Sequence, residues 1–523
     1  MHKTGIALGL ILAAGAAVTL PPWYSGTQLE GTLQAALERG NQQLREALPG
    51  QGASLELVAL ERGIFSSTAR YRIAFGEAES ADGDPAELLF SDRIEHGPLP
   101  LSRLASFELA PVLAVSRFSL ERSAAVTPWF AGAGGAVPLS GYLVLGYDDS
   151  VTGQVSLHPL ELASDQGRLR FSGIDLALKL GAQAQTVQLS GGMDSLTFDF
   201  PRDGEVAQVR LSGLSLNSEH RLGASGFYVG GSRLALARVE LLDADRPGLL
   251  VENFVQTDRI EEQGSRLSAA LDYEVGSLGY GGKPLSSASL GLTLGNLDVA
   301  ALQRLESWYK ELLARMNEPQ AQPVALTDSD ERRLRDGLEA LLAGKPSVSL
   351  DRLALRTASG ESRFDLRVEL DRPQSYELPP AELARQLIGR LEAHLVLGKP
   401  TIRDLMNFQA SLDPDADQGA AALQAEEVAE LAAMIATSTQ VGRVEGEDIV
   451  SRLSYAGGQV DFNGQAMPAE EFVAMVAGMA PGSPLELMPG VVDGEGELAG
   501  LEEEADEGYD LESVSEGGAP GGE

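Results

Sequence analysis

The chain has 523 residues, 76 acidic against 40 basic side chains, a formal net charge of -36 and no cysteine. Its length and its 43% hydrophobic content predict about two to four globular domains and exclude a globally disordered or polytopic membrane chain. The absence of cysteine excludes disulfides, a thiol nucleophile and zinc sites of the cysteine type. Because so acidic a surface repels phosphate backbones, we expect no nucleic-acid partner.

The N-terminal segment carries the most specific physical signal. No residue over 4–28 is charged, and 5–20 is almost wholly apolar behind Lys3. A helix over 4–24 would be about 31 Å long, enough to cross a bilayer. We predict a signal anchor over 1–24, with its basic end in the cytoplasm and the bulk of the chain exported across the membrane.

A cleaved secretory signal is the alternative for the same segment. Ala14-Gly15-Ala16 would then be its small-residue cleavage site, and the rest of the chain would be exported without an anchor.

The segment after the two prolines at 21–22 begins with a helical pattern. Leucines at near-helical spacing predict an amphipathic helix over 27–48. Apolar and polar residues then alternate from Leu55 to Phe75 around Arg62-Gly63, which predicts a half-buried hairpin.

Three motifs give the chain a family resemblance. They are 61–71 (ERGIFSSTARY), 94–100 (IEHGPLP), and 454–455 (SY) followed by 458–464 (GQVDFNG). Together with the exported anchor they resemble the YdgA-like family of bacterial envelope proteins over roughly residues 1–480. An aromatic residue often stands in that family where Ile64 stands here. The resemblance implies an inner-membrane-anchored protein that faces the periplasm, of uncharacterised biochemical role and with no catalytic residue to carry over.

The middle of the chain, roughly residues 105–295, is predicted to be β-structure almost throughout. Near Phe171-Ser172-Gly173 and Leu211-Ser212-Gly213 the apolar residues change from one parity to the other. A strand of period two needs an extra residue to do this, as a β-bulge provides. We therefore predict a long curved antiparallel β-sheet with one apolar and one polar face.

The back half is predicted to be mixed, which makes the fold class α+β. A capping box of Thr327 and Asp330 starts the second helix of a pair. The predicted elements are helices over 297–343, strands over 348–355 and 364–370, a helix over 380–391, a strand over 394–397, helices over 401–412 and 420–436, a hairpin over 451–462 and a helix over 470–479.

Four regions follow from these patterns. Residues 481–523 lie in a base-free, acidic stretch rich in glycine, serine and proline, which cannot bury enough apolar surface to offset its ordering entropy. The predicted regions are a signal anchor over 1–24, a β-rich periplasmic region over 25–296, an α+β region over 297–480 and a disordered acidic tail over 481–523.

The histidines are predicted to form neither a metal site nor a general base. The histidines at 2, 96, 158, 220 and 394 form no HxxxH or HExxH pair, so no helix-based metal site is predicted. His96 precedes a Gly-Pro-Leu-Pro turn, and we predict that it hydrogen-bonds this turn and is not a general base.

A calcium-loop pattern also fails on inspection. Residues 413–419 (DPDADQG) space their aspartates correctly, but the glycine comes one residue late and Gln424 stands at position 12. We predict a polar linker in which Asp417 caps the next helix. The glycines over 132–135 are predicted to form a loop, and no nucleophile elbow or phosphate loop occurs. No catalytic, metal-binding or cofactor-binding residue is therefore named.

Two functions remain open. The first is a non-enzymatic envelope protein whose curved sheet binds or scaffolds a lipid, another hydrophobic ligand or an envelope protein. The second is a periplasmic hydrolase whose acidic pair converges only in the fold. An open apolar channel of about 300 Å³ or more would favour the first, two desolvated carboxylates in a polar cleft would favour the second, and neither would leave a scaffold.

Overall fold

The computed structural model describes residues 37–38, 40–41, 53–79, 85–164, 167–202, 205–243, 248–316, 326–413 and 415–477. The predicted signal anchor, its cleaved alternative, most of the helix over 27–48 and the tail over 481–523 lie outside these residues. Within the described ranges, no helix combines the length and the apolar character that crossing a membrane requires. The chain divides into two compact units, Met1–Ala466 and Met467–Glu523.

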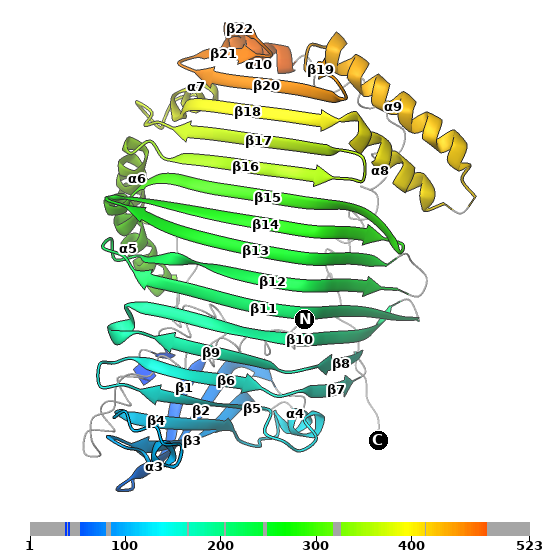
Figure 1. The fold of residues 1–523 in the computed structure, drawn as a ribbon. Helices are drawn as coiled ribbons and strands as arrows, with labels where there is room; N and C mark the ends of the chain where they lie inside the picture. Colours follow the sequence, from blue (N-terminus) through cyan, green and yellow to red (C-terminus); the bar gives the residue numbers. More distant parts are fainter. Residues whose placement is uncertain are drawn as a thin grey trace, which may run out of the picture. The chain divides into compact units, whose positions relative to one another are not determined.

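The strands of the described residues join into one antiparallel sheet of 22 strands (Figure 1). They are β1 (Ser54–Glu61), β2 (Ser66–Glu79), β3 (Pro85–His96), β4 (Ala114–Leu120), β5 (Leu139–Leu145), β6 (Val151–Leu157), β7 (Leu160–Ser164), β8 (Gly167–Phe171), β9 (Ile174–Leu180), β10 (Thr186–Arg202), β11 (Glu205–Leu222), β12 (Tyr228–Leu242), β13 (Leu249–Gln263), β14 (Arg266–Tyr280), β15 (Lys283–Asp298), β16 (Ser347–Arg356), β17 (Glu361–Leu370), β18 (Ile388–Gly398), β19 (Arg443–Glu445), β20 (Asp448–Ala456), β21 (Gln459–Phe462) and β22 (Gln465–Pro468).

The strand order largely follows the chain. Strands β1 to β6 pair in sequence, β6 pairs with β9, and β9 pairs with β10. From β10 each strand pairs with the next as far as β18, which pairs with β20. This confirms the predicted α+β class and its long antiparallel sheet.

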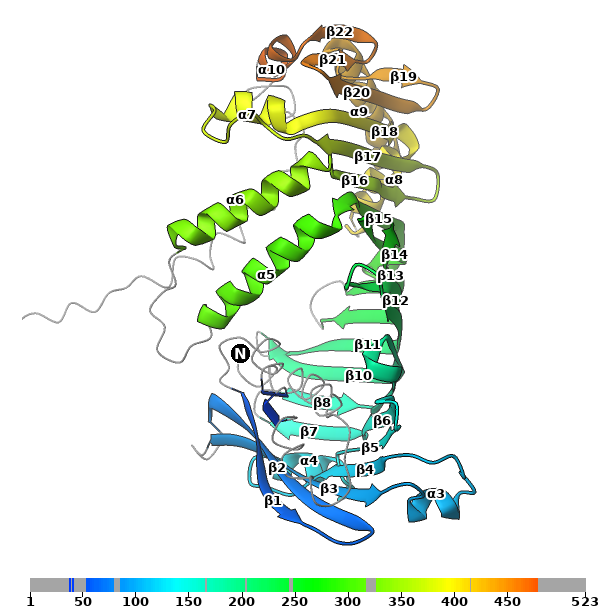
Figure 2. The same ribbon diagram turned by 90° about the vertical axis from the view of Figure 1, so that its left-hand side faces the viewer.

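The helices connect strands or follow them. They are α3 (Leu101–Ala105), α4 (Thr127–Gly132), α5 (Val299–Met316), α6 (Asp328–Ala343), α7 (Pro380–Leu387), α8 (Lys399–Ser411), α9 (Gln418–Ser438) and, in the second unit, α10 (Ala469–Ala477). Both α5 and α6 contact β15 and lie on one side of the sheet (Figure 2).

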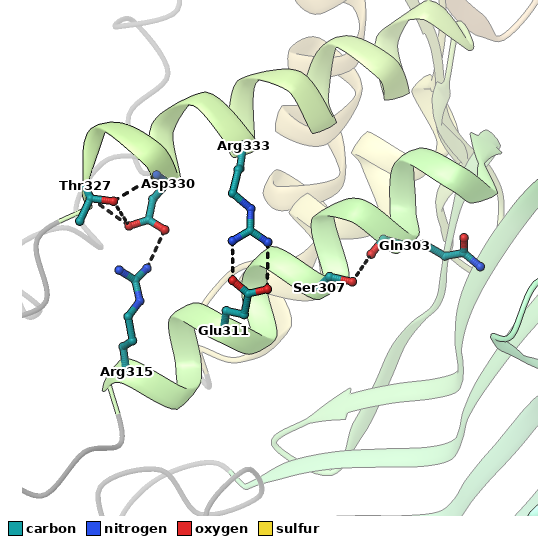
Figure 3. A network of polar contacts seen from close by, with 7 residues as sticks. All are labelled: Gln303, Ser307, Glu311, Arg315, Thr327, Asp330 and Arg333. Carbon is teal, nitrogen blue, oxygen red and sulfur yellow. Dashed lines mark hydrogen bonds and ion pairs between the residues drawn. The ribbon is translucent and has the colours of Figure 1, made fainter.

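Helices α5 and α6 form the predicted pair and are joined by two ion pairs (Figure 3). The capping box is confirmed, because Asp330 N donates to Thr327 Oγ1 at 3.2 Å and Thr327 N donates to Asp330 Oδ2 at 3.0 Å. Arg315 Nη2 also donates to Asp330 Oδ1 at 2.7 Å. These hydrogen bonds, above all that from Arg315, hold the pKa of the Asp330 carboxyl well below its usual range.

One element boundary was predicted wrongly. Helix α7 ends at Leu387 and β18 begins at Ile388, whereas the sequence pattern predicted a helix to Leu391. Leu391 pairs with Val368 of β17 and with Tyr455 of β20, so packing between two neighbouring strands overrides the local helical preference. The predicted division at 296–297 stays a prediction, and it falls within β15, which pairs with β16.

The fully buried core of the first unit is concentrated in its N-terminal strands. Ala69 and Ile94 have no exposed surface, and Val126 and Phe130 pack against the same core from the segment around α4. A second small core forms where Ala433 and Ala436 of α9 meet Ile449. The middle strands differ, because most of their apolar side chains are only half-buried.

Candidate functional site

Apolar side chains form continuous rows across the middle strands. Residues directly opposite each other on antiparallel strands point to the same face, so each row lies on one face of the sheet. The rows are Met193, Leu214, Leu236, Phe254, Val275, Ala288 and Leu355; then Leu216, Leu234, Gln256, Tyr273, Leu290, Leu353, Phe364 and Leu395; then Leu271, Leu292, Leu350, Leu366 and Ala393; and finally Leu196, Leu211, Val239, Val251 and Leu278. We call this surface the apolar face.

The apolar face is long and largely uncovered. From β10 to β18 it crosses eight strand spacings, or about 38 Å at about 4.8 Å each. Met193 is buried, but Leu353 is 49% exposed and Leu395 is 40% exposed. Among the described helices, α5 lies against part of this face, with Leu302 near Ile260.

Five strands share an interruption that keeps the apolar side chains on one face. The pairs on both sides of the interruption keep the same register, and one residue in each strand is left out of the pairing. These residues are Asp194, Gly213, Ala237, Asn253 and Gly276. We call them the interruption line.

The geometry at two of these residues explains the change of parity. Gly213 has a φ of 67° and Asn253 a φ of 54°, in the left-handed region that glycine and asparagine tolerate best. Because each strand has its own extra residue, the apolar positions switch parity in all five strands at once. Leu211 therefore pairs with Val239 before the line, and Leu214 pairs with Leu236 after it.

The predicted bulges take a different form in the structure. No register shift occurs between β11 and either neighbour, so Gly213 is not the extra residue of a single bulged strand. At Gly173, where φ is 95°, the chain breaks into β8 and β9, which both pair with β10. Sequence reasoning found the parity changes at Gly173 and Gly213 and missed those at Asp194, Ala237, Asn253 and Gly276. The switch from Leu236 to Val239 was the signal that could have found the change at Ala237.

The opposite face of these strands is polar. Arg238 donates to Glu240 at 2.8 Å and to Glu252 at 2.9 Å, and Arg210 lies 3.3 Å from Glu240. Such a ladder of exposed ion pairs is typical of the solvated side of a sheet and adds little stability. The sheet is therefore amphipathic, as predicted.

A pocket of about 200 Å³ lies where α5 meets the strand ends. Seven apolar side chains and Ser268 line it, among them Leu302 of α5 and Ile260 of β13. Ile260 pairs with Ala269, which pairs with Leu294, so the pocket is continuous with the apolar rows. It is smaller than the channel of about 300 Å³ expected for an enclosed ligand site, which makes the open face the main feature.

The described histidines lie in separate places. His220 Nδ1 is 3.1 Å from the Ser218 hydroxyl, His394 Nδ1 is 3.5 Å from Asp365, and His158 is exposed. His2 lies outside the described residues. No group of three acidic or histidine side chains in the described part of the chain is placed to hold a metal ion.

The aspartates over 413–419 form the predicted cap. Asp417 Oδ1 accepts hydrogen bonds from Gly419 N at 2.8 Å and from Ala420 N at 3.2 Å, at the start of α9. Asp413 Oδ1 accepts one from Asp415 N at 2.9 Å, and Pro414 lies outside the described residues. The glycines at 134 and 135, with φ of 63° and 88°, form the predicted loop after α4.

His96 joins two turns, but its side chain lies against Ser67 and Ile64 of the turn between β1 and β2 and not against the Gly-Pro-Leu-Pro turn that was predicted. Its Nε2 lies 3.0 Å from the Ser67 hydroxyl, and its Nδ1 lies 3.3 Å from the Ile64 carbonyl oxygen. Its backbone N–H donates to Phe65 O at 2.9 Å. The motifs over 61–71 and 94–100 are therefore in direct contact, although 29 residues separate Ser67 from His96.

One buried carboxyl lies in the core close to these turns. Burial raises the pKa of Asp92 to about 6, against hydrogen bonds from the Ser116 hydroxyl and the Arg117 backbone amide that lower it. The Ser116 bond is 2.8 Å long. Burial, and then the charge of Asp92, raise the pKa of the Tyr71 hydroxyl. Neither side chain lines the pocket.

Comparison with known proteins agrees with the motifs that meet at His96. Residues 1–470 match the family described as "Bacterial protein of unknown function (DUF945)". The chain belongs to the DUF945 family. This confirms the resemblance predicted from the three motifs and covers nearly the whole chain.

Two relatives from Escherichia coli K12 match the DUF945 chain over almost its full length. Protein YdgA is 25% identical over 492 residues, which cover 91% of this chain and 97% of YdgA. The uncharacterized protein YihF is 21% identical over 482 residues, which cover 90% of this chain and 97% of YihF. An uncharacterized protein of Haemophilus influenzae is 26% identical over 188 residues, which cover 36% of this chain and 50% of that protein. No solved structure matches the chain.

Proposed function

We propose that this DUF945 protein is a membrane-anchored envelope protein that faces the periplasm and holds the acyl chains of a lipid on its apolar face. The observation that carries the proposal is the set of half-exposed rows, in which Leu292, Leu353 and Leu395 face solvent on one side of the sheet. Soluble proteins rarely leave contiguous apolar surface of this kind without a binding role.

An acyl chain fits this surface better than a protein partner does. Protein interfaces mix apolar area with hydrogen-bonding and charged groups, whereas the rows that define the apolar face contain no charged residue and are bordered on the same face by Asp258, which pairs with Leu271 and lies near His220. Their length of about 38 Å exceeds the roughly 30 Å of a whole hydrocarbon core. An extended acyl chain, which needs burial but no hydrogen bonds, can therefore lie entirely on the face.

The location part of the proposal rests on the sequence. The uncharged segment over 4–28 and its single basic flank favour an anchor that exports the rest of the chain. The hydrolase alternative has less support, because no carboxylate lines the pocket. The buried carboxyl of Asp92 instead accepts a hydrogen bond from its own neighbouring strand.

The proposal is tested by lipid retention on the full chain. Wild type is extracted from membranes, washed in mild detergent and analysed for phospholipid per chain by mass spectrometry. A Leu353→Gln/Leu395→Gln variant changes the apolar face at β16 and β18, and both side chains are exposed enough that folding tolerates the change. Arg363→Gln is the matched control, because Arg363 is exposed and pairs with Ala354, one residue away from Leu353 and hence on the opposite face.

The N-terminal segment is unchanged in all three proteins, so lipid held by an anchor contributes equally to each measurement. We expect wild type and Arg363→Gln to retain equal lipid. The double variant should retain at least about tenfold less lipid, since two leucine contacts with the acyl chain are lost. Equal lipid in all three proteins would contradict the proposal.

A further inference from the structure

A second apolar surface lies at the turns that His96 joins. Ile64 is 87% exposed and Phe107 is 88% exposed, which is unusual for large apolar side chains. The other members are Phe65, Leu99, Leu101, Leu104 and Leu109, each at least 40% exposed. We call these seven residues the apolar tip.

The tip is one contiguous structure held by hydrogen bonds. The turn between β1 and β2 is fixed to the start of the α3 segment through His96, as described above. Within that segment Gly97 N donates to Leu113 O at 2.8 Å, and Val112 N donates to Pro98 O at 3.0 Å. The segment from 97 to 113 is therefore closed at its base, where Val112 is buried, while Leu101, Phe107 and Leu109 stay exposed.

Phe107 has a backbone conformation that its side chain does not favour. Its φ of 58° lies in the left-handed region, where a bulky residue is an outlier. Burial of the side chain does not offset this strain, because Phe107 is almost fully exposed. Strain of this kind is commonly found at binding sites.

The charge around the tip differs from that of the whole chain. The turn over 61–65 and the segment over 97–110 contain two acidic and two basic residues, whereas the chain carries -36. Arg103 and Glu108 pair with each other at 2.7 Å. Because the tip itself is neutral, it can approach a phospholipid surface without the charge repulsion that the rest of the chain would meet there.

We propose that the apolar tip inserts into the interface of a phospholipid bilayer. Apolar side chains presented on turns can enter the headgroup boundary without a complementary partner surface. Leu37 packs into the core of the N-terminal strands that carry the tip, so only the 12 residues over 25–36, which span at most roughly 40 Å, would separate a signal anchor over 1–24 from these strands. This last argument rests on the proposed anchor, but the measurement below does not.

The absence of cysteine allows a direct test on the full chain. Ile64→Cys introduces a single thiol for an environment-sensitive fluorophore, and the labelled chain is reconstituted with phosphatidylethanolamine–phosphatidylglycerol vesicles. Lipids that carry a spin label on the acyl chain then quench the fluorophore if it enters the bilayer. Val206→Cys is the matched control. Val206 is an apolar residue of 64% exposure outside the apolar tip, on the hairpin of β10 and β11.

We expect blue-shifted emission and quenching at Ile64→Cys and neither at Val206→Cys. Added salt should not weaken the quenching, because insertion is apolar and not ionic. Absent quenching at Ile64→Cys, or equal quenching at both sites, would overturn the proposal. A blue shift without vesicles that grows with protein concentration would also overturn it, since this indicates a second copy as the occupant.

Phe107→Gly, measured with the label at Ile64→Cys, separates docking from folding. Glycine relieves the left-handed strain, so we expect an unfolding midpoint at least as high as that of wild type. The ratio of docked to undocked protein should fall about tenfold, because the apolar Phe107 side chain is lost. Unchanged quenching in this variant would overturn the proposal. Leu353→Gln/Leu395→Gln should still dock, so failure of lipid retention and failure of docking are distinguishable.

Discussion

The Ser67 hydroxyl lies 3.0 Å from His96 Nε2, and this contact joins the turn after β1 to the turn after β3. Ser67 is only 2% exposed and His96 is half-buried, so the contact is partly shielded from solvent and restrains the two turns that carry the apolar tip. A buried hydrogen bond between distant segments contributes by restraining both of them.

Removing this contact should loosen the tip without unfolding the sheet. In His96→Ala the Ser67 hydroxyl loses its partner, and we expect the backbone amides of the turn at 62–66 to lose about 1 kcal/mol of protection. Hydrogen exchange with mass spectrometry measures this directly. His158→Ala, at an exposed histidine after β6, is the control and should change nothing at the tip. Unchanged protection in His96→Ala would show that the turns are held by other contacts.

The interruption line should be sensitive to backbone conformation. A Cβ at Gly213 would lie 2.7 Å from the Ala237 Cβ, and φ there is 67°. We expect Gly213→Ala to destabilise the chain by about 1–2 kcal/mol from the left-handed backbone alone, with the clash in addition. Ala237→Gly in the same chain should restore the part due to the clash. Denaturant midpoints of the three proteins provide the measurement, and a Gly213→Ala protein as stable as wild type would refute the assigned geometry.

Asn253 allows a complementary test at the next but one strand. Its φ of 54° suits asparagine and glycine but not a β-branched residue. We expect Asn253→Gly to be tolerated and Asn253→Val to lower the free energy of unfolding by about 1–2 kcal/mol. Similar midpoints for the two variants would contradict a left-handed residue at this position.

Asp92 should make stability depend on pH in a defined window. Its pKa in the folded chain is about 6, above the ordinary value of 3.8, so the folded state binds more protons between these values. Stability from this group is therefore complete below about pH 4 and is lost as the pH rises through 6, by about 3 kcal/mol in total. The difference between wild type and Asp92→Asn isolates the effect from the other acids. A difference that is constant from pH 4 to 7 would contradict the raised pKa.

Local patterns predicted the elements well, whereas relations between distant strands were seen only in the structure. The Thr327 capping box and the Asp417 cap depend on residues three or fewer apart, and both are confirmed. The predicted helix end at Leu391 was wrong because the strand partners of Leu391, Val368 and Tyr455, lie far away in sequence.

The candidate surfaces show the same division. One sequence reveals a parity change at Gly213, but only strand pairing shows that Asn253 and Gly276 continue the same line. The motif around His96 was recognised, yet its contact with Ser67 and the exposure of Phe107 follow from tertiary structure. The sequence therefore predicts an apolar face but not how much of it stays uncovered.

Site-specific photo-crosslinking in cells tests the central claim most directly. A benzophenone amino acid replaces Leu353 on the apolar face or Arg363 on the opposite face of the full chain, and cellular phospholipid is labelled with radioactive phosphate. We expect a light-dependent phospholipid adduct at Leu353 and none at Arg363, because only the first position lies against a bound acyl chain. Equal labelling at both positions, no lipid adduct at Leu353, or a protein adduct there in its place would contradict lipid binding by this face.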